Sequence, residues 1–322
     1  MTVGLVHHAV RVPATTANLG PGFDALGLAL DRYLAVRSCA RDRAGTRVEC
    51  LGEGAGEIGG GDDNLVWRAL TAFCEHHGVP VPNVGLVANS EVPLERGMGS
   101  SSAAIVAGLV LARSLTGVEV GDHELVTLAD ELEGHPDNVA PALLGGLVAC
   151  ARGQDGTLVA RRVNPAPGLR PLVLVPELRQ LTSEARSVLP ALLPRADAAA
   201  QAARAAHVLA GMTGTWPVAP SVAVDLIHEP ARLEVMEPTA RVLTSLREAG
   251  VQAWLSGAGP SVGLMAPRRD TGVAALAQQV GAHEGFRLLE VDVDLAGAIS
   301  CPEGACGVAG GSDCVQCPRR RV

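Results

Sequence analysis

The spacing of hydrophobic and polar residues along the chain changes between the period of a strand and that of a helix. Residues 8–12, His-Ala-Val-Arg-Val, alternate as a strand does, and the polar, Gly- and Pro-containing residues 14–24 that follow are typical of a loop. Residues 101–116 are rich in Ala and Leu and stop at Gly117. Residues 122–133 place apolar side chains at i, i+3, i+4 and i+7. The pattern predicts a strand over the first range and helices over the last two.

The second half of the chain continues this alternation. Residues 172–175 form a short apolar run typical of a buried strand, and residues 196–212 favour a helix by propensity. Two further apolar runs, 251–255 and 262–265, flank a Gly-rich turn, as in a hairpin. Segment 153–171 is rich in Pro and Gly, so we place a junction between domains there. The chain is predicted to be a mixed α and β protein without internal repeats.

Composition and charge narrow the class of protein. With 322 residues, 48% hydrophobic and 19% charged, the chain can form one or two packed domains, which excludes disorder as its main state. Its net charge of −8 has the wrong sign for binding nucleic-acid phosphates, so we expect no nucleic-acid partner. No apolar run reaches about 18 residues, and no signal peptide pattern opens the chain. We therefore expect a cytoplasmic protein with no membrane partner.

The chain contains no lysine, and all 26 of its basic Lys or Arg residues are Arg. The Walker phosphate loop and the protein-kinase fold both need a lysine near the nucleotide, so both are excluded. Phosphate chemistry would have to use backbone amides, hydroxyl groups, Arg and a metal ion. With three Trp, one Tyr and three Phe, the chain also has few side chains for stacking on bases.

The strongest chemical signal is the stretch Pro93–Ala104, PLERGMGSSSAA, which runs into the 101–116 helix. Gly97 and Gly99 let the backbone approach an anion, and the serines at 100–102 offer hydroxyl donors. The helix N-terminus adds free N–H groups and a partial positive charge. Together these features predict a phosphate cradle that needs no lysine. On composition alone, a Ser-capped helix after a Gly turn remains an equal alternative.

Two shorter segments are candidates for contacts with a ligand. Segment 133–138, Glu-Gly-His-Pro-Asp-Asn, follows the 122–133 helix and is dense in polar side chains that can hold a polar substrate. The alternative is an ordinary polar loop at a helix exit. Segment 256–261, Ser-Gly-Ala-Gly-Pro-Ser, lies between two apolar runs and, taken alone, is a hairpin turn.

The eight cysteines fall into two groups. The scattered group, typical of buried thiols, comprises Cys39, Cys50, Cys74 and Cys150. The second group, near the C-terminus, comprises Cys301, Cys306, Cys314 and Cys317. One pair of the second group has the two-residue gap of zinc sites, but the seven-residue middle interval is short for a zinc ribbon. Because residues 301–322 are Gly-rich and lack apolar periodicity, we expect a flexible tail, with zinc or redox chemistry as the alternative.

Three motifs, in this order, resemble the signature motifs of the GHMP small-molecule kinases, the family that includes galactokinase, homoserine kinase and mevalonate kinase. They are Val12–Asp24 (VPATTANLGPGFD), the Pro93–Ala104 loop and Ser256–Ser261. The first motif, residues 134–146 (GHPDNVAPALLGG) and the Thr182-x3-Arg186 pair resemble the homoserine kinases more than the other members.

The resemblance covers about residues 8–298 and leaves the cysteine-containing tail outside. One departure is Met98, where the usual loop has Leu, and this is a volume-conserving apolar change.

The resemblance implies an α+β fold of two domains with the nucleotide between them. Residues 1–160 would form an N-terminal GHMP kinase domain that carries the phosphate loop, residues 161–300 a C-terminal ferredoxin-like domain, and residues 301–322 the tail. The implied reaction transfers the γ-phosphate of ATP, with Mg²⁺, to the side-chain hydroxyl of L-homoserine, giving O-phospho-L-homoserine for threonine biosynthesis. A homodimer is an expectation at the level of the family.

The resemblance also implies roles for individual residues. The residues expected at the ATP phosphates are Pro93, Arg96, Gly97, Met98, Gly99, Ser100, Ser101 and Ser102, with Asn64 near the base. The expected catalytic residues are Ser101, Glu133, Asp137 and Asn138, of which Ser101 and Glu133 would bind the metal. The residues expected to bind the amino acid are Asn18, Asp24, His135, Asp137, Thr182, Arg186, Arg232 and Gly257. Two Arg side chains suit a carboxylate, and Asp24 suits an ammonium group.

Alternatives remain open for both mechanism and substrate. Asp137 is a candidate general base, but we expect catalysis to depend mainly on positioning, with Asn138 orienting the hydroxyl. The fold would equally serve a mevalonate-like or sugar alcohol. A third hypothesis is a nucleotide- or amino-acid-binding sensor without catalysis, in which the cysteine tail acts as a redox or metal switch.

Overall fold

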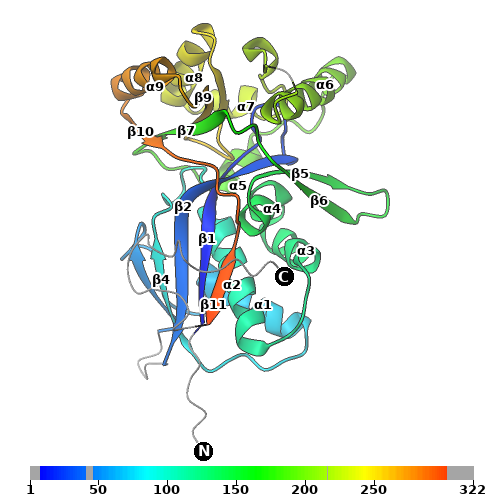
Figure 1. Ribbon diagram of the computed structural model, residues 1–322, viewed down its shortest axis with the longest axis vertical. Helices are drawn as coiled ribbons and strands as arrows, with labels where there is room; N and C mark the ends of the chain where they lie inside the picture. The colour runs from blue at the N-terminus through cyan, green and yellow to red at the C-terminus, as the bar shows by residue number, and fades with distance from the viewer. Residues whose placement is uncertain (1–7, 41–45, 216, 303–322) are drawn as a thin grey trace, which may run out of the picture.

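The computed structural model describes residues 8–40, 46–215 and 217–302, and gives only the backbone of Thr182 and Ser183. Two β-sheets, each covered by helices, lie one above the other in Figure 1. The chain passes from the first sheet to the second between residues 163 and 169, inside the Pro- and Gly-rich segment. It returns to the first sheet with its last strand, beside the first.

The first sheet has the order β11-β1-β2-β4-β3, and β5 extends it from β2 to β6. Its strands are β1 (His8–Ala17), β2 (Leu26–Cys39), β3 (Val48–Gly52), β4 (Gly85–Ser90), β5 (Leu147–Arg152), β6 (Leu158–Val163) and β11 (Ile299–Pro302). All neighbours are antiparallel except β3 and β4, which are parallel.

Four helices pack with this sheet. They are α1 (Leu65–His76), α2 (Ser100–Thr116), α3 (Asp122–Glu133) and α4 (Pro136–Leu144). Helix α2 is buried from Ser102 to Ala112 except at Ala104, because its residues are small or apolar on nearly every side. It therefore runs through the middle of the domain, between α1 and α3. Its N-terminus, which follows the phosphate loop, is anchored by that packing.

The second sheet is antiparallel, with the order β10-β7-β9-β8. Its strands are β7 (Leu169–Pro176), β8 (Gln252–Leu255), β9 (Val262–Pro267) and β10 (Phe286–Glu290). The helices of this half are α5 (Thr182–Ser187), α6 (Arg195–Met212), the 3-10 turn η1 (Pro220–Val222), α7 (Glu229–Leu233), α8 (Glu237–Glu248) and α9 (Thr271–His283). With α8 and α9 as its two helices, the order β7-α8-β8-β9-α9-β10 is the ferredoxin-like arrangement that the resemblance implied.

Two segments predicted as loops contain regular secondary structure. The first strand continues to Ala17, since residues 14–17 pair with β2 after a register shift at Pro13. The buried hydroxyls of Thr15 and Thr16 have hydrogen-bond partners, so polar residues are accommodated inside a strand. The interpretation of residues 133–138 as a loop at a helix exit is wrong beyond His135. Helix α4 begins at Pro136, whose fixed φ suits the first position of a helix.

The tail was predicted to begin at residue 301, and this is wrong for its first two residues. Cys301 is buried and pairs with Ala9, and Pro302 pairs with His8, so both belong to β11. The other tail cysteines, Cys306, Cys314 and Cys317, lie outside the described residues. In the described ranges, none of the helices combines the length and the apolar character that crossing a membrane requires.

Candidate active site

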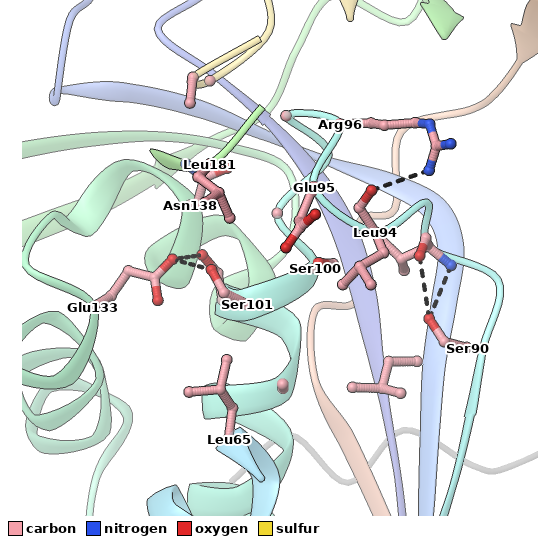
Figure 2. Close-up of a pocket in the computed structure, with 18 of the residues that line it drawn as sticks. Leu65, Ser90, Leu94, Glu95, Arg96, Ser100, Ser101, Glu133, Asn138 and Leu181 are labelled. Carbon is pink, nitrogen blue, oxygen red and sulfur yellow. Dashed lines mark hydrogen bonds between the residues drawn. The ribbon is translucent and has the colours of Figure 1, made fainter. Parts of the chain in front are cut away.

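The residues singled out from the sequence meet in a cleft lined by both halves of the molecule (Figure 2). The predicted residues that line it are Asn18, Asp24, Asn64, Arg96, Gly97, Gly99, Ser100, Ser101, Ser102, Glu133, His135, Asp137, Asn138, Arg186, Arg232 and Gly257. Pro93 and Met98 are not among the lining residues. Both are buried, and Met98 packs in the core between the sheets. Of Thr182, only the backbone at the start of α5 is described.

Glycines shape the phosphate loop between β4 and α2. Gly97 and Gly99 have φ angles of 70° and 69°, in the left-handed region that favours glycine. A Cβ atom at Gly97 would lie 2.1 Å from the carbonyl oxygen of Ser256, and one at Gly99 would lie 2.0 Å from Thr15 Oγ1. The two glycines are therefore required by packing within the protein as well as by any approach of an anion.

The N-terminus of α2 faces the cleft without a side-chain cap. Its free N–H groups and its dipole favour a negatively charged ligand. Ser101 Oγ and Ser102 Oγ donate hydrogen bonds of 2.5 and 2.8 Å to the same oxygen of Glu133, at the end of α3. Within the described residues, the second oxygen of Glu133 receives no hydrogen bond. Ser101 and Glu133 thus offer hard oxygen ligands beside a phosphate site, a set that fits Mg²⁺.

A chain of hydrogen bonds supports the phosphate loop from behind. Trp254 Nε1 donates to Thr16 Oγ1 at 2.9 Å, Thr16 and Ser256 hydroxyls are 2.8 Å apart, and Ser256 Oγ donates to the Gly97 carbonyl at 2.6 Å. Because the Ser256 hydroxyl donates its hydrogen to the Gly97 carbonyl, the Thr16 hydroxyl must be the donor in the hydrogen bond between Thr16 and Ser256. The third sequence motif therefore holds the second one in place from the opposite domain.

Three side chains at the start of α4 form a buried polar group. His135 Nδ1 lies 2.8 Å from Asp137 Oδ1, and Asn138 Oδ1 accepts a 2.8 Å hydrogen bond from Thr15 Oγ1. Burial lowers the pKa of His135, but the hydrogen bond to Asp137 and the charges of Asp137 and Glu133 outweigh it, so this pKa is raised overall. The hydrogen bond to His135 thus occupies one carboxylate oxygen of Asp137 and fixes its orientation.

The opposite end of the cleft carries charges of both signs. Arg186 of α5 binds both carboxylate oxygens of Asp24, at 2.7 and 3.2 Å. Both side chains are about one-third exposed. An amino acid has an ammonium group and a carboxylate, so it can interact with both members of this pair without leaving either charge uncompensated.

Arg232 of α7 is buried beside this pair. Its Nε donates to the Ala185 carbonyl at 3.1 Å, and its Nη1 donates to the Gly257 carbonyl and to His228 Nδ1 at 3.1 and 3.2 Å. Within the described residues, these bonds leave Nη2 for a ligand. Burial and the neighbouring Arg186 lower the pKa of Arg232 to about 10, so its guanidinium stays charged at neutral pH.

Comparisons with known proteins show which family the chain resembles. Residues 64–146 match the model of the GHMP kinases N terminal domain. The homoserine kinase of Leifsonia xyli subsp. xyli is 41% identical over 295 residues, covering 90% of each chain. The chain belongs to the homoserine kinases. The homoserine kinase of Moorella thermoacetica is 43% identical over 79% of this chain and 85% of its own. The crystal structure of homoserine kinase from Cytophaga hutchinsonii has a TM-score of 0.80 at 26% identity, covering 94% of this chain and 99% of the other.

In this homoserine kinase, two of the residues predicted at the nucleotide make hydrogen bonds to the protein's own backbone. Asn64 caps α1: its side chain accepts from Val66 N at 3.0 Å and donates to the Gly59 carbonyl at 2.9 Å. The guanidinium of Arg96 donates to the carbonyls of Leu94, Pro176 and Glu177, which ties the phosphate loop to the end of β7. Both residues line the cleft, but their polar atoms hold the protein's own backbone.

Several residues line the cleft in addition to those predicted from the sequence. Phe23 lies within cation–π distance of two guanidinium groups, with its ring centroid 5.7 Å from Arg186 Cζ and 5.5 Å from Arg232 Cζ. In the sequence, only its position immediately before Asp24 indicated that Phe23 lies in the cleft. Glu95, within the phosphate loop itself, has a φ of 56°, unusual for a residue with a side chain, and Figure 2 labels it among the residues that line the cleft. Gln180 and Leu181 come from the segment before α5, which carried no motif.

Proposed function

We propose that this protein transfers the γ-phosphate of ATP to the side-chain hydroxyl of L-homoserine, with Mg²⁺ as the metal ion. The observation that carries the proposal is the proximity, in one cleft, of an uncapped helix N-terminus and a site with both charges of an amino acid. Phosphates bind at the first feature and a zwitterion at the second. The names of the homologous homoserine kinases support the same substrate.

At the nucleotide end, the backbone amides at the start of α2 would bind the phosphates, and the serine hydroxyls would support them. Ser101 and Glu133 would hold Mg²⁺, which neutralises charge on the phosphate oxygens. Apolar side chains cover the part of the cleft near Asn64 and suit the flat surface of a base. They are Leu34, Leu51, Ile58, Leu65, Val66, Ala88 and Val92.

At the amino-acid end, Arg186 and Arg232 would bind the carboxylate and Asp24 the ammonium group. The hydroxyl oxygen of homoserine then forms a bond to the γ-phosphorus while the bond from that phosphorus to the bridging oxygen of ADP breaks, and the hydroxyl proton passes to an oxygen of the transferred phosphoryl group. Because Asp137 is paired with His135, we assign these residues to orienting the hydroxyl, together with Asn138, rather than to removing its proton. Catalysis would then come mainly from positioning and from stabilisation of phosphoryl charge.

The first experiment is a measurement of Mg²⁺-dependent ADP release with L-homoserine, L-serine, L-threonine and mevalonate. The mass of the product identifies the phosphorylated molecule. Selective turnover of L-homoserine is the expected result. Turnover with mevalonate alone would contradict the assignment of L-homoserine as the substrate. Tight ATP binding without turnover of any alcohol would favour a sensor without catalytic activity.

A pair of variants tests the amino-acid end of the site. Arg186→Ala removes charge-assisted hydrogen bonds worth about 1.5–3 kcal/mol, so the KM for L-homoserine should rise roughly 10- to 100-fold. Arg179→Ala is the matched control, because Arg179 is exposed, pairs with Glu57 and does not line the cleft. Equal KM values for the two variants would remove Arg186 from the substrate site.

A further inference from the structure

Two histidines and a glutamate meet on the surface away from the cleft, where α1 ends and α3 begins. His76 is the last residue of α1, His77 is its C-cap, and Glu124 lies in the first turn of α3. The ligand atoms of the three side chains all lie within 4.8 Å of one another. Glu124 Oε1 is 3.8 Å from His76 Nε2 and 3.7 Å from His77 Nε2.

The contacts of His77 point to a missing partner. Its Nε2 is buried but has no hydrogen-bond partner, and 3.7 Å to Glu124 is too long for a hydrogen bond. The ring is held in place by the buried Phe73, at 4.4 Å between ring centroids, and by His76 at 4.9 Å. A buried nitrogen that is held toward a carboxylate without bonding to it calls for an explanation such as a bound ion.

We propose that His76, His77 and Glu124 bind a divalent transition-metal ion of the Zn²⁺ class. Two imidazoles and one carboxylate are ligands that Zn²⁺ prefers, and solvent can supply the remaining position. Ligand atoms about 2.1 Å from a tetrahedral ion lie about 3.4 Å apart, so the two distances from Glu124 to the histidines need to shorten by only a few tenths of an ångström. His76 and Glu124 are about half exposed and free to make that adjustment.

The dipoles of α1 and α3 also favour a bound cation at this place. The C-terminal end of α1 is the negative end of its dipole and favours a cation, while the N-terminal end of α3 favours the Glu124 carboxylate. The site is distinct from the cleft, since Glu124 and Glu133 are nine residues apart on α3, roughly 14 Å along the axis. Helices α1 and α3 carry Asn64 and Glu133 at the ends that face the cleft. The ion would hold their opposite ends together.

The test is Zn²⁺ titration by calorimetry of the full-length protein, freed of metal by dialysis and without ATP. Other groups of the chain, including its tail cysteines, also have affinity for Zn²⁺, so the informative quantity is the difference between variants. The wild type should bind one more ion per chain than His76→Ala/His77→Ala, and Glu124→Gln should weaken that ion at least about 10-fold. The matched controls His283→Ala and Glu131→Gln, both exposed and outside the cluster, should keep the wild-type value.

A second readout is the midpoint of thermal unfolding. Added Zn²⁺ should raise it in the wild type and the controls but not in the cluster variants, because only the folded state brings the three ligands together. Equal midpoints in a chelator would establish that the variants fold. Identical stoichiometry and affinity in the wild type and in Glu124→Gln would overturn the proposal, whatever the double variant does.

Discussion

Acidification should destabilise this protein through His228, one of its most deeply buried side chains. The ring is fully enclosed and stacks on Phe23, with 5.0 Å between the ring centroids. Its Nδ1 accepts the hydrogen bond from Arg232, and its Nε2 lies 3.7 Å from Asp225. Burial, which outweighs the opposing charge of Asp225, lowers the pKa of His228 to about 4. The residue is therefore neutral in the folded protein at neutral pH.

The size of the effect follows from proton linkage. An unfolded histidine has a pKa of about 6.5, so between pH 6.5 and 4 the unfolded chain binds a proton that the folded chain excludes. The free energy of unfolding falls as the pH falls through this window, by about 1.4 kcal/mol per pH unit or about 3 kcal/mol in total. The contribution is complete above pH 6.5 and is lost as the pH approaches 4.

The assay is urea unfolding followed by circular dichroism, at steps from pH 7.5 to 4, on the wild type and on His228→Asn. The Asn side chain does not titrate, and its carbonyl oxygen can accept from Arg232 as Nδ1 does. Subtracting the two profiles removes the titration of the carboxylates. The wild type should lose about 3 kcal/mol more than the variant between pH 6.5 and 4.

The same substitution has a matched control. His283→Asn replaces an exposed histidine at the end of α9, and its profile should run parallel to that of the wild type. Parallel profiles for His228→Asn as well would refute the reasoning, because they would mean that His228 binds its proton equally well in the folded protein.

Two further substitutions test the cleft. Glu133→Gln should lower kcat by at least about 100-fold in the ADP-release assay and weaken the dependence on Mg²⁺, whereas Glu131→Gln, exposed on the same helix, should leave both unchanged. Ser256→Ala leaves the Gly97 carbonyl without its donor and should cost about 1–3 kcal/mol, measured as a roughly 10-fold higher KM for ATP or a lower unfolding midpoint. Ser261→Ala, in the same loop, removes a buried hydroxyl that has no hydrogen-bond partner, so it should cost nothing in either measurement.

Elements set by local signals were predictable from the sequence. The helices over 101–116 and 122–133 and the hairpin around 256–261 have the expected positions, because periodicity and glycine stops act within a few residues. The strand through residues 14–17 was missed because its polar side chains are satisfied by distant partners. Thr15 bonds to Asn138, and Thr16 bonds to Trp254 and Ser256.

Close packing between distant segments was equally invisible in the sequence. Gly27 of β2 lies against α4, and a Cβ atom there would be 1.8 Å from the carbonyl oxygen of Asp137. This glycine sets how near Asp137 and Asn138 can approach the phosphate loop. In the sequence it is one Gly within an apolar run, and nothing nearby indicates a partner 110 residues later.

For some residues the sequence predicted the location in the cleft, but it did not indicate which groups their side chains bind. Asn64 and Arg96 line the cleft, as the resemblance implied, yet each uses its polar atoms on backbone groups. An asparagine at a helix start and an arginine surrounded by carbonyls have local structural uses that compete with ligand binding. Only their hydrogen-bond partners in three dimensions separate these uses.

The charges at the amino-acid end bear on which alcohol the cleft accepts. Asp24 and Arg186 neutralise each other when no ligand is bound, and buried Arg232 supplies one further positive charge. An alcohol with a carboxylate but no ammonium group would draw Arg186 away and leave Asp24 without a partner. A sugar would offer neither charge and would leave Arg232 desolvated behind it. Under the proposed assignment, a zwitterion with a hydroxyl on its side chain would satisfy all three residues at once, so discrimination would follow from the cost of leaving a charge unpaired rather than from the shape of the cleft.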